Sequence, residues 1–476
     1  MSARAALVAI DLGAESCRVS LLQWPDGTPS VRMVHRFANA PIASGASLRW
    51  DLDRICSELE QGLRSCAEFA PDGIASIGVT GWAVDYVRLD ANGRPHTQPF
   101  CYRDARTAGA MAAVHERVPV EHLYAVTGVQ IQQINTIYQL YADKLSGVPD
   151  AAPWVNLPEY ILHWLGGPRV AEYTNATHTA LIDARTQRWS SELFGALGLD
   201  LAAAPEIVAP GTPLGAMNHR LSKLAAFRDT QLIAPACHDT ASAIAGIPAE
   251  DDSWAYISSG TWSLVGTPLA TPHNTAEARA LGFTNLGGVA GRVLLHRGIP
   301  GMWILRQCMD VWERQSPCSV EALIAECEGL PEPDFMLDLD DPEFLAPGDM
   351  PVRIYDQLAR RRLPVLPSGC EAAPLYANLI FHSLAGRYSA LLKSAATMTG
   401  KKLNRICVVG GGSRNELLNR LTAQASGLPV TRCSPESSTV GNFAVQCSRL
   451  DQPEGNLSAA TVAAHARALV PALQSR

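Results

Sequence analysis

The stretch at residues 7–22 reads LVAIDLGAESCRVSLL, and its pattern returns at residues 256–266 as YISSGTWSLVG. An isoleucine, a glycine and a serine recur at the same spacing, as Ile10, Gly13 and Ser16 and again as Ile257, Gly260 and Ser263. Each stretch is typical of an apolar strand, a tight turn and a second apolar strand. Because successive N–H groups in such a turn form an anion-binding nest, the repetition predicts two phosphate-holding hairpins rather than two ordinary ones. An ATP-dependent phosphotransferase needs this arrangement.

The bulk composition is that of a two-domain globular protein that does not bind polyanions. The chain has 476 residues, 47% hydrophobic and 18% charged, which is too long for one compact core. Its net charge is -7 and its pI about 6.0. Lysine and arginine are scattered, and the arginine run at 360–362 is typical of a solvated helix end. We therefore expect no nucleic-acid partner.

The cysteines and the hydropathy favour a soluble cytoplasmic protein. The 12 cysteines include no CxxC pair, which argues against a zinc site of the usual spacing. No stretch approaches the roughly 18 to 20 apolar residues of a membrane span, and no signal-peptide core precedes the first strand. We expect mostly reduced thiols and no membrane partner, with one or two disulfides left open.

Strand and helix patterns alternate along the first half, which indicates an α/β class. The sequence predicts strands at 7–12, 17–23, 31–36, 74–79 and 84–89, and a helix at 51–69. Asp53 is a candidate cap for that helix. The turn at 90–93 is a strong hairpin signal.

The second half repeats this order, which predicts a duplicated fold around a cleft. Strands are expected at 254–258, 262–267, 292–295 and 405–409, and helices from 302, at 372–399 and at 415–426, with a loop at 331–351. The predicted domains are 1–246 and 247–476, with a connector at 247–252. An amphipathic helix at 458–473 suits packing on the body or in a dimer, so the chain is expected to be a monomer or a homodimer.

Asp11 ends the first strand, directly before the turn at Gly13. A carboxylate there would repel bound phosphates unless a cation intervened. Mg²⁺ held largely through water resolves the conflict, because Mg²⁺ prefers a few carboxylates plus phosphate oxygens. The alternative is a turn aspartate that makes a local hydrogen bond.

His238, Asp239 and Thr240 stand between an apolar strand and a helix of small residues. An aspartate at a helix start is usually a cap. Thr240 could be the cap instead, which would free Asp239 near the domain joint. A carboxylate there accepts the proton of a substrate hydroxyl as that hydroxyl attacks the γ-phosphoryl group, and phosphoryl transfer needs positioning more than a strong base.

The run CVVGGGSRN, at 407–415, places three glycines between a strand and a helix. Glycines let the backbone lie against a planar base, near helix N-terminal amides. A dinucleotide-binding turn is the alternative, but Arg414 occupies the place of its last glycine. An adenosine contact is therefore the preferred interpretation.

Two further runs are candidates for sugar contact. Trp82 in TGWAVD is either a core residue or an apolar wall for a sugar ring with Asp85 nearby, and the sequence does not decide between them. The run at 102–106, YRDAR, is either a donor cluster or a surface salt-bridge cluster.

Together these residues resemble the FGGY family of carbohydrate kinases. The resemblance runs from about residue 7 to 430 through VAIDLGAESCRV, HRFANAP, IGVTGWAVDYVRLD, CYRDARTAGAM, INTIYQLYA, EYTNATHTALID, CHDTASAIAG, YISSGTWSLVG and VVGGGSRNELLNRL. It implies an α/β fold of two actin-like (ribonuclease H-like) ATPase domains with a cleft between them. It also implies ATP, Mg²⁺ and γ-phosphoryl transfer to a primary hydroxyl of a ketose.

The resemblance also implies roles for particular residues. Asp239 is the expected general base, and the expected metal-associated carboxylates are Asp11 and Asp239. Residues expected at the sugar are Trp82, Ala83, Asp85, Arg103, His238 and Thr240. Residues expected at ATP are Gly13, Ala14, Glu15, Ser16, Cys17, Arg18, Gly260, Thr261, Arg306, Gly410, Gly411, Gly412 and Asn415.

Three positions depart from the subgroup that the chain most resembles. Ala83 stands in place of a substrate-contacting glycine, Gly298 in place of a sugar-binding asparagine, and Arg306 in place of a nucleotide-side glutamine. Losing a buried polar partner changes substrate discrimination strongly. The resemblance makes L-rhamnulose the first candidate, and these departures make L-fuculose, L-ribulose, D-xylulose or a polyol the alternatives. An actin-like ATPase switch without transfer activity is the alternative of another class.

Overall fold

The computed structural model describes residues 5–474 and divides into two compact units. Unit 1 comprises Met1–Glu250, Pro268–Leu295 and Glu436–Arg476, and unit 2 comprises Asp251–Thr267 and His296–Pro435. The chain first passes from unit 1 to unit 2 within the predicted connector at 247–252. The predicted domain boundary at 246/247 stays a prediction, because compactness in space and division along the sequence are different properties.

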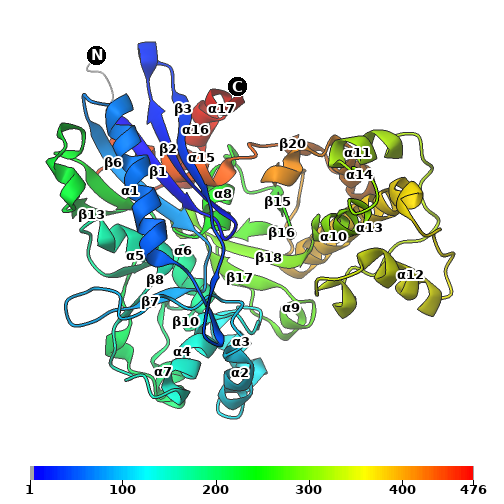
Figure 1. Ribbon diagram of the computed structural model, residues 1–476, viewed down its shortest axis with the longest axis horizontal. Helices are drawn as coiled ribbons and strands as arrows, with labels where there is room; N and C mark the ends of the chain where they lie inside the picture. Colours follow the sequence, from blue (N-terminus) through cyan, green and yellow to red (C-terminus); the bar gives the residue numbers. More distant parts are fainter. Residues whose placement is uncertain (1–4, 475–476) are drawn as a thin grey trace. The chain divides into compact units, whose positions relative to one another are not determined.

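The main sheet of unit 1 mixes parallel and antiparallel strands, in the order β13-β14-β6-β1-β2-β3 (Figure 1). In chain order its strands are β1 (Ala6–Leu12), β2 (Ser16–Gln23), β3 (Ser30–Ala38), β6 (Ile74–Gly81), β13 (Thr212–Ala216) and β14 (Gln231–Ala234). The first three pair antiparallel, as predicted, and β1, β6 and β14 are parallel. The carboxyl ends of these three parallel strands therefore meet at one edge of the sheet.

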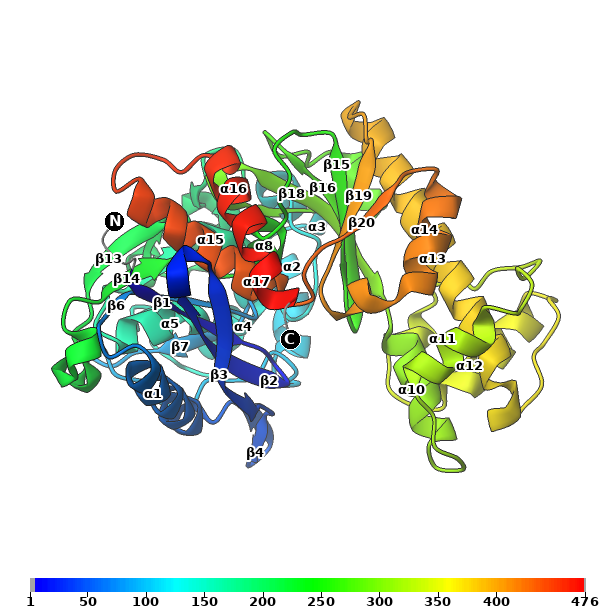
Figure 2. The same cartoon turned by 90° about the horizontal axis from the view of Figure 1, so that it is seen from above.

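Helices cover both faces of this sheet (Figure 2). Val8, Ile10 and Leu12 point to the face of α1 (Leu52–Phe69) and join one hydrophobic core with it. Because side chains alternate along a strand, Asp11 points to the opposite face. That face carries α8 (Asp239–Ala245) and α15 (Ser437–Asp451).

The cap of α1 differs from the prediction. The Asp51 carboxylate accepts from the backbone N–H of Arg54 at 3.0 Å, so Asp51 is the N-cap. Asp53 lies within the first turn, where its carboxylate accepts from the Gln98 amide at 2.6 Å. Both residues suit a helix start, and the fold selects the one that lies just outside the helix.

Helix α15 is attached to the sheet by polar side chains along one of its faces. Ser438, Asn442 and Gln446 are spaced four residues apart, so they lie on one side of the helix. The Asn442 amide donates to the Gly78 carbonyl at 3.2 Å, and the Gln446 amide donates to the Val8 carbonyl at 3.0 Å. A Cβ at residue 78 would lie 2.5 Å from the Asn442 amide oxygen, so Gly78 permits this contact.

The remaining elements of unit 1 surround this sheet. Its two-stranded sheets are β4 (Ile42–Ser44) with β5 (Ser47–Arg49), β7 (Tyr86–Arg88) with β8 (Trp154–Asn156), β9 (Val170–Glu172) with β12 (Glu206–Val208), and β10 (Ile182–Asp183) with β11 (Arg188–Trp189). Its other helices are α2 (Thr107–His115), α3 (Val120–Thr127), α4 (Thr136–Leu145), α5 (Leu157–Trp164), α6 (Tyr173–Ala176), α7 (Ser191–Leu197), α9 (Ala276–Ala280), α16 (Ala459–Leu469) and α17 (Pro471–Gln474). The C-terminal helix α16 packs on the body of unit 1, where Arg467 pairs with Glu250 at 2.7 Å.

The second large sheet has the order β17-β18-β16-β15-β19-β20, and unit boundaries fall inside β16 and β18. Its strands are β15 (Trp254–Ser259), β16 (Trp262–Leu269), β17 (Thr284–Gly287), β18 (Val293–Pro300), β19 (Arg405–Val409) and β20 (Val430–Arg432). The helices of unit 2 are α10 (Trp303–Trp312), α11 (Val320–Cys327), α12 (Met350–Arg360), α13 (Ala373–Thr399) and α14 (Glu416–Ser426). The core order β18-β16-β15-β19-β20 repeats β3-β2-β1-β6-β14, which confirms the predicted duplication of an α/β fold.

The described part of the chain contains neither a disulfide nor a helix that could span a membrane. All twelve cysteines lie within it, and none of them forms a disulfide. Among residues 5–474, no helix is both long and apolar enough to span a bilayer.

Candidate functional site

Three predicted segments meet at the carboxyl edge of the sheet in unit 1. Asp11 is the last residue but one of β1, Trp82 directly follows β6, and His238 lies in the loop after β14. The backbone N–H of Gly81 donates to the Cys237 carbonyl at 2.9 Å, and that of Trp82 donates to the Leu12 carbonyl at 3.1 Å. In parallel α/β sheets, this edge is where ligand-binding residues collect.

Asp11 is buried, and it accepts a hydrogen bond from a residue far away in the sequence. The Ser438 hydroxyl at the start of α15 donates to its carboxylate at 2.7 Å. Arg18, its cross-strand partner, lies 3.7 Å away and forms a closer ion pair of 2.5 Å with Glu436. Burial raises the pKa of Asp11 to about 6, against the lowering effects of Arg18 and Ser438, while the charge of nearby Asp239 raises it further.

The turn after Asp11 offers its backbone rather than its side chains. A Cβ at Gly13 would overlap the Ser16 carbonyl oxygen, so the turn requires glycine there. The Asn39 side chain donates to the Gly13 carbonyl at 3.0 Å and supports the turn. The Cys17 side chain lies in the core on the α1 side, where burial raises its pKa to about 12. Ala14, Glu15 and Ser16 lie at the partly exposed tip.

Asp239 is the first residue of α8, and His238 is the N-cap position. Thr240 therefore does not cap the helix. Its hydroxyl instead donates to the Asp239 carboxylate at 3.1 Å. Burial raises the pKa of Asp239 to about 6, yet 36% of its side-chain surface remains exposed. The carboxylate is thus accessible to a substrate, and the His238 ring nitrogen Nε2 lies 3.2 Å from it.

Asp85 is fully buried and holds aromatic residues. Its Oδ2 accepts from the indole N–H groups of Trp50 at 2.6 Å and Trp82 at 2.9 Å. Its Oδ1 accepts from the Gln139 amide at 3.2 Å. Burial raises the pKa of Asp85 to about 6, against the lowering effect of these donors. Asp85 therefore orients Trp82, which is 6% exposed, rather than presenting a free carboxylate.

Val84, between Ala83 and Asp85, has a left-handed backbone with a φ of 71°. This conformation is a genuine outlier for a β-branched residue. The Val84 carbonyl accepts from the Thr136 hydroxyl at 2.7 Å and from the Gln139 amide at 3.1 Å. These two donors hold a strained turn beside Trp82, and such strain is typical of functional sites.

The predicted run at 102–106 divides into an exposed and a buried part. Arg103 is exposed, with its guanidinium over the Tyr102 ring at 5.2 Å. Arg106 pairs with Asp143 at 2.5 Å, and Asp104 accepts from the backbone of Leu48 at 2.6 Å. The interpretation as a surface salt-bridge cluster is therefore wrong for Arg106 and Asp104, which are structural.

The predicted glycine turn of unit 2 lies between β15 and β16. The Gly260 carbonyl accepts from the backbone N–H of Met302 at 3.1 Å, and the Thr261 carbonyl accepts from that of Trp303 at 3.0 Å. Thr261 is exposed at the tip. This turn is thereby joined to the start of α10, and within it the backbone N–H of Gly260 donates to the Trp262 carbonyl at 3.0 Å.

The three glycines after β19 pass close to β15. A Cβ at Gly412 would overlap the Ser259 hydroxyl, and a Cβ at Gly410 would lie 2.8 Å from the Ser259 carbonyl. Gly411 has open space beside it. Asn415 caps α14 by accepting from the Leu418 N–H at 2.9 Å, and its buried amide nitrogen has no hydrogen-bond partner.

Three positions differ from the subgroup that the chain most resembles, and two of them, Gly298 and Arg306, also lie in unit 2. Arg306 on α10 is 53% exposed and pairs with Asp310 at 2.6 Å and Glu313 at 3.0 Å. Gly298 on β18 is exposed, and a Cβ there would meet the end of the Leu264 side chain at 3.1 Å. Both positions could therefore accept the side chain expected from the resemblance.

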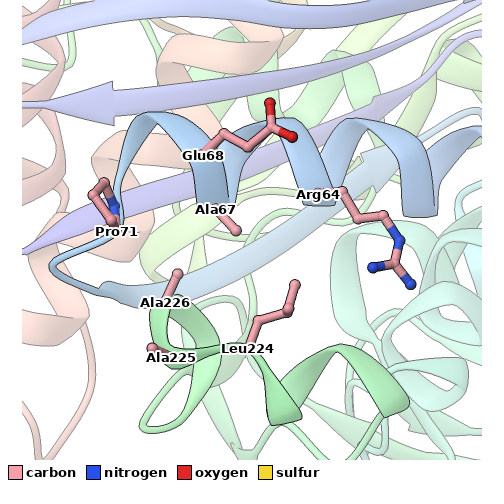
Figure 3. Close-up of a pocket in the computed structure, with 7 residues that line it drawn as sticks. All are labelled: Arg64, Ala67, Glu68, Pro71, Leu224, Ala225 and Ala226. Atoms are coloured by element: carbon pink, nitrogen blue, oxygen red, sulfur yellow. The ribbon is translucent and has the colours of Figure 1, made fainter.

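A groove of about 330 Å³ lies away from these residues (Figure 3). It is lined by Arg64, Ala67, Glu68, Pro71, Leu224, Ala225 and Ala226, none of which is a candidate site residue.

Among the residues that the structure describes, no three His, Cys, Asp or Glu side chains converge to hold a metal ion.

Sequence reasoning missed the residues that support the site. Ser438 holds Asp11, Asn39 holds the Gly13 turn, and Gln139 holds both Val84 and Asp85. Gln139 lies within the quoted motif INTIYQLYA, which was the available signal. Ser438 lies more than 400 residues from Asp11, and no local pattern relates the two.

Solved structures define the class of protein through its fold. The xylulose kinase of Lactobacillus acidophilus superposes with a TM-score of 0.77 at 16% identity, covering 97% of this chain and 92% of that one. The glycerol kinase of Plasmodium falciparum, solved with ADP, gives 0.74 at 14% identity over the same shares. The fold is thus that of two-domain α/β sugar kinases, as predicted.

Family and curated relatives then identify the chain. Models of the N-terminal and C-terminal domains of the FGGY family of carbohydrate kinases match residues 6–246 and 255–450. The rhamnulokinase of Bacteroides thetaiotaomicron is 36% identical over 443 residues, which cover 92% of this chain and 89% of the relative. That of Oceanobacillus iheyensis is 34% identical over 463 residues, 96% of each chain. The chain belongs to the FGGY family of carbohydrate kinases, and it is an ATP-dependent sugar kinase with an alcohol group as phosphoryl acceptor.

Proposed function

We propose that this kinase transfers the γ-phosphoryl group of ATP to a primary hydroxyl of a ketose, with L-rhamnulose as the first candidate. The observation that carries the proposal is the state of Asp239. Asp239 is the first residue of α8 and is not its N-cap. Its side chain remains 36% exposed beside His238. Asp239 is proposed to accept the proton of the sugar hydroxyl as that oxygen attacks the phosphorus.

Other residues of unit 1 are proposed to bind the sugar. His238 and Thr240 flank Asp239, and Trp82 and Ala83 form an apolar wall that Asp85 orients through the Trp82 indole. Arg103 is exposed and is proposed to contact the sugar with its guanidinium. A sugar ring suits such a wall because one of its faces is apolar while its rim carries hydroxyl groups.

The residues proposed to bind ATP come from both units. The turns at Gly13–Arg18 and at Gly260–Thr261 are proposed to lie against the phosphates of ATP, as backbone turns that form anion-binding nests do. The backbone at Gly410, Gly411 and Gly412, with Asn415, is proposed to lie along the adenosine, and Arg306 to lie on the nucleotide side.

Asp11 and Asp239 fit a divalent cation. The charge of Asp239 raises the pKa of Asp11, so the two carboxylates lie close enough to repel. We propose that Mg²⁺ associates with these two carboxylates, largely through water and phosphate oxygens. When bound, Mg²⁺ would neutralise part of the negative charge of the phosphates.

The choice of ketose rests on the curated relatives and on two departing positions. Identity of 34–36% to rhamnulokinases supports L-rhamnulose. Ala83 adds a methyl group to the pocket wall, and Gly298 lacks a polar side chain, which favours another ketose or polyol as the second candidate. A cytoplasmic location and a monomeric or dimeric state stay predictions.

The test is ADP release in a coupled assay with L-rhamnulose, L-fuculose, L-ribulose, D-xylulose, D-ribulose, glycerol and no sugar. We expect the highest kcat/KM with L-rhamnulose. A better alternative sugar would refute that choice, and Gly298→Asn with Ala83→Gly should then shift the preference towards L-rhamnulose. Turnover that ignores every sugar would instead support an ATPase switch.

A further inference from the structure

One motif of the sequence, EYTNATH at 172–178, has no role in the site described so far. It spans the end of β9, the short helix α6 and the turn after it. Glu172 and Thr174 are fully buried, and they belong to the same unit as Asp239. Neither residue touches the surface on which a sugar would bind, so a direct role in binding is excluded for both.

The motif binds the loop that precedes the proposed base at two successive backbone groups. The Glu172 carboxylate accepts from the backbone N–H of Cys237 at 2.7 Å. The Thr174 hydroxyl accepts from the backbone N–H of His238 at 3.3 Å and itself donates to Glu172 at 2.5 Å. These bonds form a closed chain from one peptide group of the loop to the next.

A third contact fixes the ring of His238. The Nε2 atom of His178 lies 3.1 Å from Nδ1 of His238, and the ring centroids are 3.9 Å apart. The other nitrogen of His238 faces Asp239. The ring is therefore held between the motif on one side and the proposed base on the other.

Glu172 is itself held in place from behind. Its backbone N–H donates to the Glu159 carboxylate at 3.0 Å, and the Asn175 amide donates to the same carboxylate at 2.8 Å. The second carboxylate oxygen of Glu172 accepts from the backbone N–H of Thr174 at 2.9 Å. The group that holds the loop thus has little freedom to move, which is what accurate placement of a reacting group requires.

We propose that Glu172, Thr174 and His178 are positioning residues that fix the backbone and ring of the loop at 237–238 and so aim the Asp239 carboxylate at the substrate hydroxyl. This inference rests on the proposed function, because it requires Asp239 to be the base. It predicts that the motif affects turnover more than binding. Ground-state binding of the nucleotide does not depend on the direction of one carboxylate, whereas proton transfer does.

The test compares Thr174→Val with Thr174→Ser. Valine keeps the shape of threonine and removes the hydroxyl, whereas serine keeps the hydroxyl. Thr230→Val is the matched control, because Thr230 is equally buried, donates to the Ile74 carbonyl at 2.7 Å and lies before β14, at the opposite end from the loop. For each variant we would measure kcat and KM with the preferred sugar, MgADP affinity by calorimetry and the melting temperature.

We expect Thr174→Val to lower kcat by about 10- to 100-fold with MgADP affinity within about 2-fold of wild type. Thr174→Ser should recover most of that loss, and Thr230→Val should melt earlier with an unchanged kcat. The inference is wrong if Thr174→Val keeps the wild-type kcat, or if kcat and MgADP affinity fall together. If Thr174→Val does not fold, His178→Ala supplies the same comparison. A wild-type chain without sugar-dependent turnover would overturn the proposed function itself, a result distinct from either of these.

Discussion

The hairpins β1–β2 and β15–β16 repeat one sequence pattern, yet they are built differently. Leu12 pairs with Cys17 in the first, leaving four residues, 13–16, in the turn. Ser259 pairs with Ser263 in the second, leaving three residues, 260–262. Ser263 is therefore in the strand pairing, and its hydroxyl meets that of Tyr388 at 2.7 Å. Equal spacing along a sequence does not guarantee equal register, because each turn is set by its own surroundings.

The hairpins also differ in charge. Asp11 stands two residues before the first glycine, and Ser258 stands two residues before the second. A carboxylate therefore precedes the first turn, whereas a hydroxyl precedes the second. We infer that both hairpins bind phosphate and that unit 1 alone supplies the groups for proton transfer and for the cation.

The largest expected effect tests this concentration of chemistry in unit 1. Asp239→Asn should lower kcat by about 10²- to 10⁴-fold, because the amide cannot accept the hydroxyl proton. MgADP affinity, measured by calorimetry, should persist. Turnover near the wild-type value would show that Asp239 is not the base.

The next effect compares the two hairpins at their charged position. Asp11→Asn should raise the Mg²⁺ concentration for half-maximal activity by about 10- to 100-fold, because the charge that attracts the cation is lost. Ser258→Ala, at the matching position, should leave that concentration unchanged. Equal shifts in the two variants would remove the proposed asymmetry.

Glycine requirements provide a test that needs no substrate. Gly13→Ala should lower the free energy of unfolding by about 1–3 kcal/mol, since its Cβ would overlap the backbone oxygen of Ser16, which cannot move aside alone. Gly260→Ala should be tolerated, because its nearest neighbour, the Trp262 carbonyl oxygen, lies 3.6 Å away. Urea unfolding of both variants decides the matter, and equal losses would contradict the difference in turn geometry.

A smaller effect concerns the support of Asp11. Ser438→Ala should raise the Mg²⁺ concentration for half-maximal activity by about 10-fold, as expected from the loss of one hydrogen bond to a charged group. Ser448→Ala is the control, because its hydroxyl donates only to the Ala444 carbonyl of the same helix at 2.7 Å. A matching loss in the control would mean that helix α15, rather than the bond to Asp11, is responsible.

The smallest effect is a pH dependence of stability. Burial raises the pKa of Glu159 to about 7 and that of Glu172 to about 8, from 4.5. Protons therefore bind the folded chain more tightly, so this contribution to stability is complete below pH 4.5 and is lost as the pH rises through 7 to 8. The melting temperature of Glu172→Gln should accordingly fall less than that of wild type between pH 6.5 and 9. Parallel curves for the two proteins would contradict this.

Much of the fold followed from local patterns. The alternating strand and helix signals predicted β1, β2, β3, β6, β15, β19 and α13 within a few residues, because each element carries its own periodicity. The same reasoning misplaced details that depend on neighbours. It named Asp53 as a candidate cap of α1, where Asp51 is the cap, and it offered Thr240 as a cap of α8, where His238 holds the N-cap position.

Candidate site residues followed from the sequence where one motif contains the whole chemical unit. Asp11 with its glycine turn and His238 with Asp239 are contiguous, so residue type and spacing were enough to select them. The roles proposed for them remain to be measured. Asp85 was selected as a sugar contact, which stays a prediction, and only the structure showed that its carboxylate accepts from two indoles and one amide.

The sequence by itself determined the duplicated α/β plan, the kinase family and the short motifs that carry charge and backbone donors. Only the tertiary structure decided which residues hold those motifs in place. Helix α15 brings Ser438 to Asp11, and the EYTNATH segment brings Glu172 and Thr174 to the loop before Asp239. These bonds join residues separated by 427, 65 and 64 positions. Local periodicity encodes which face of an element is buried but not which distant polar group will meet it there.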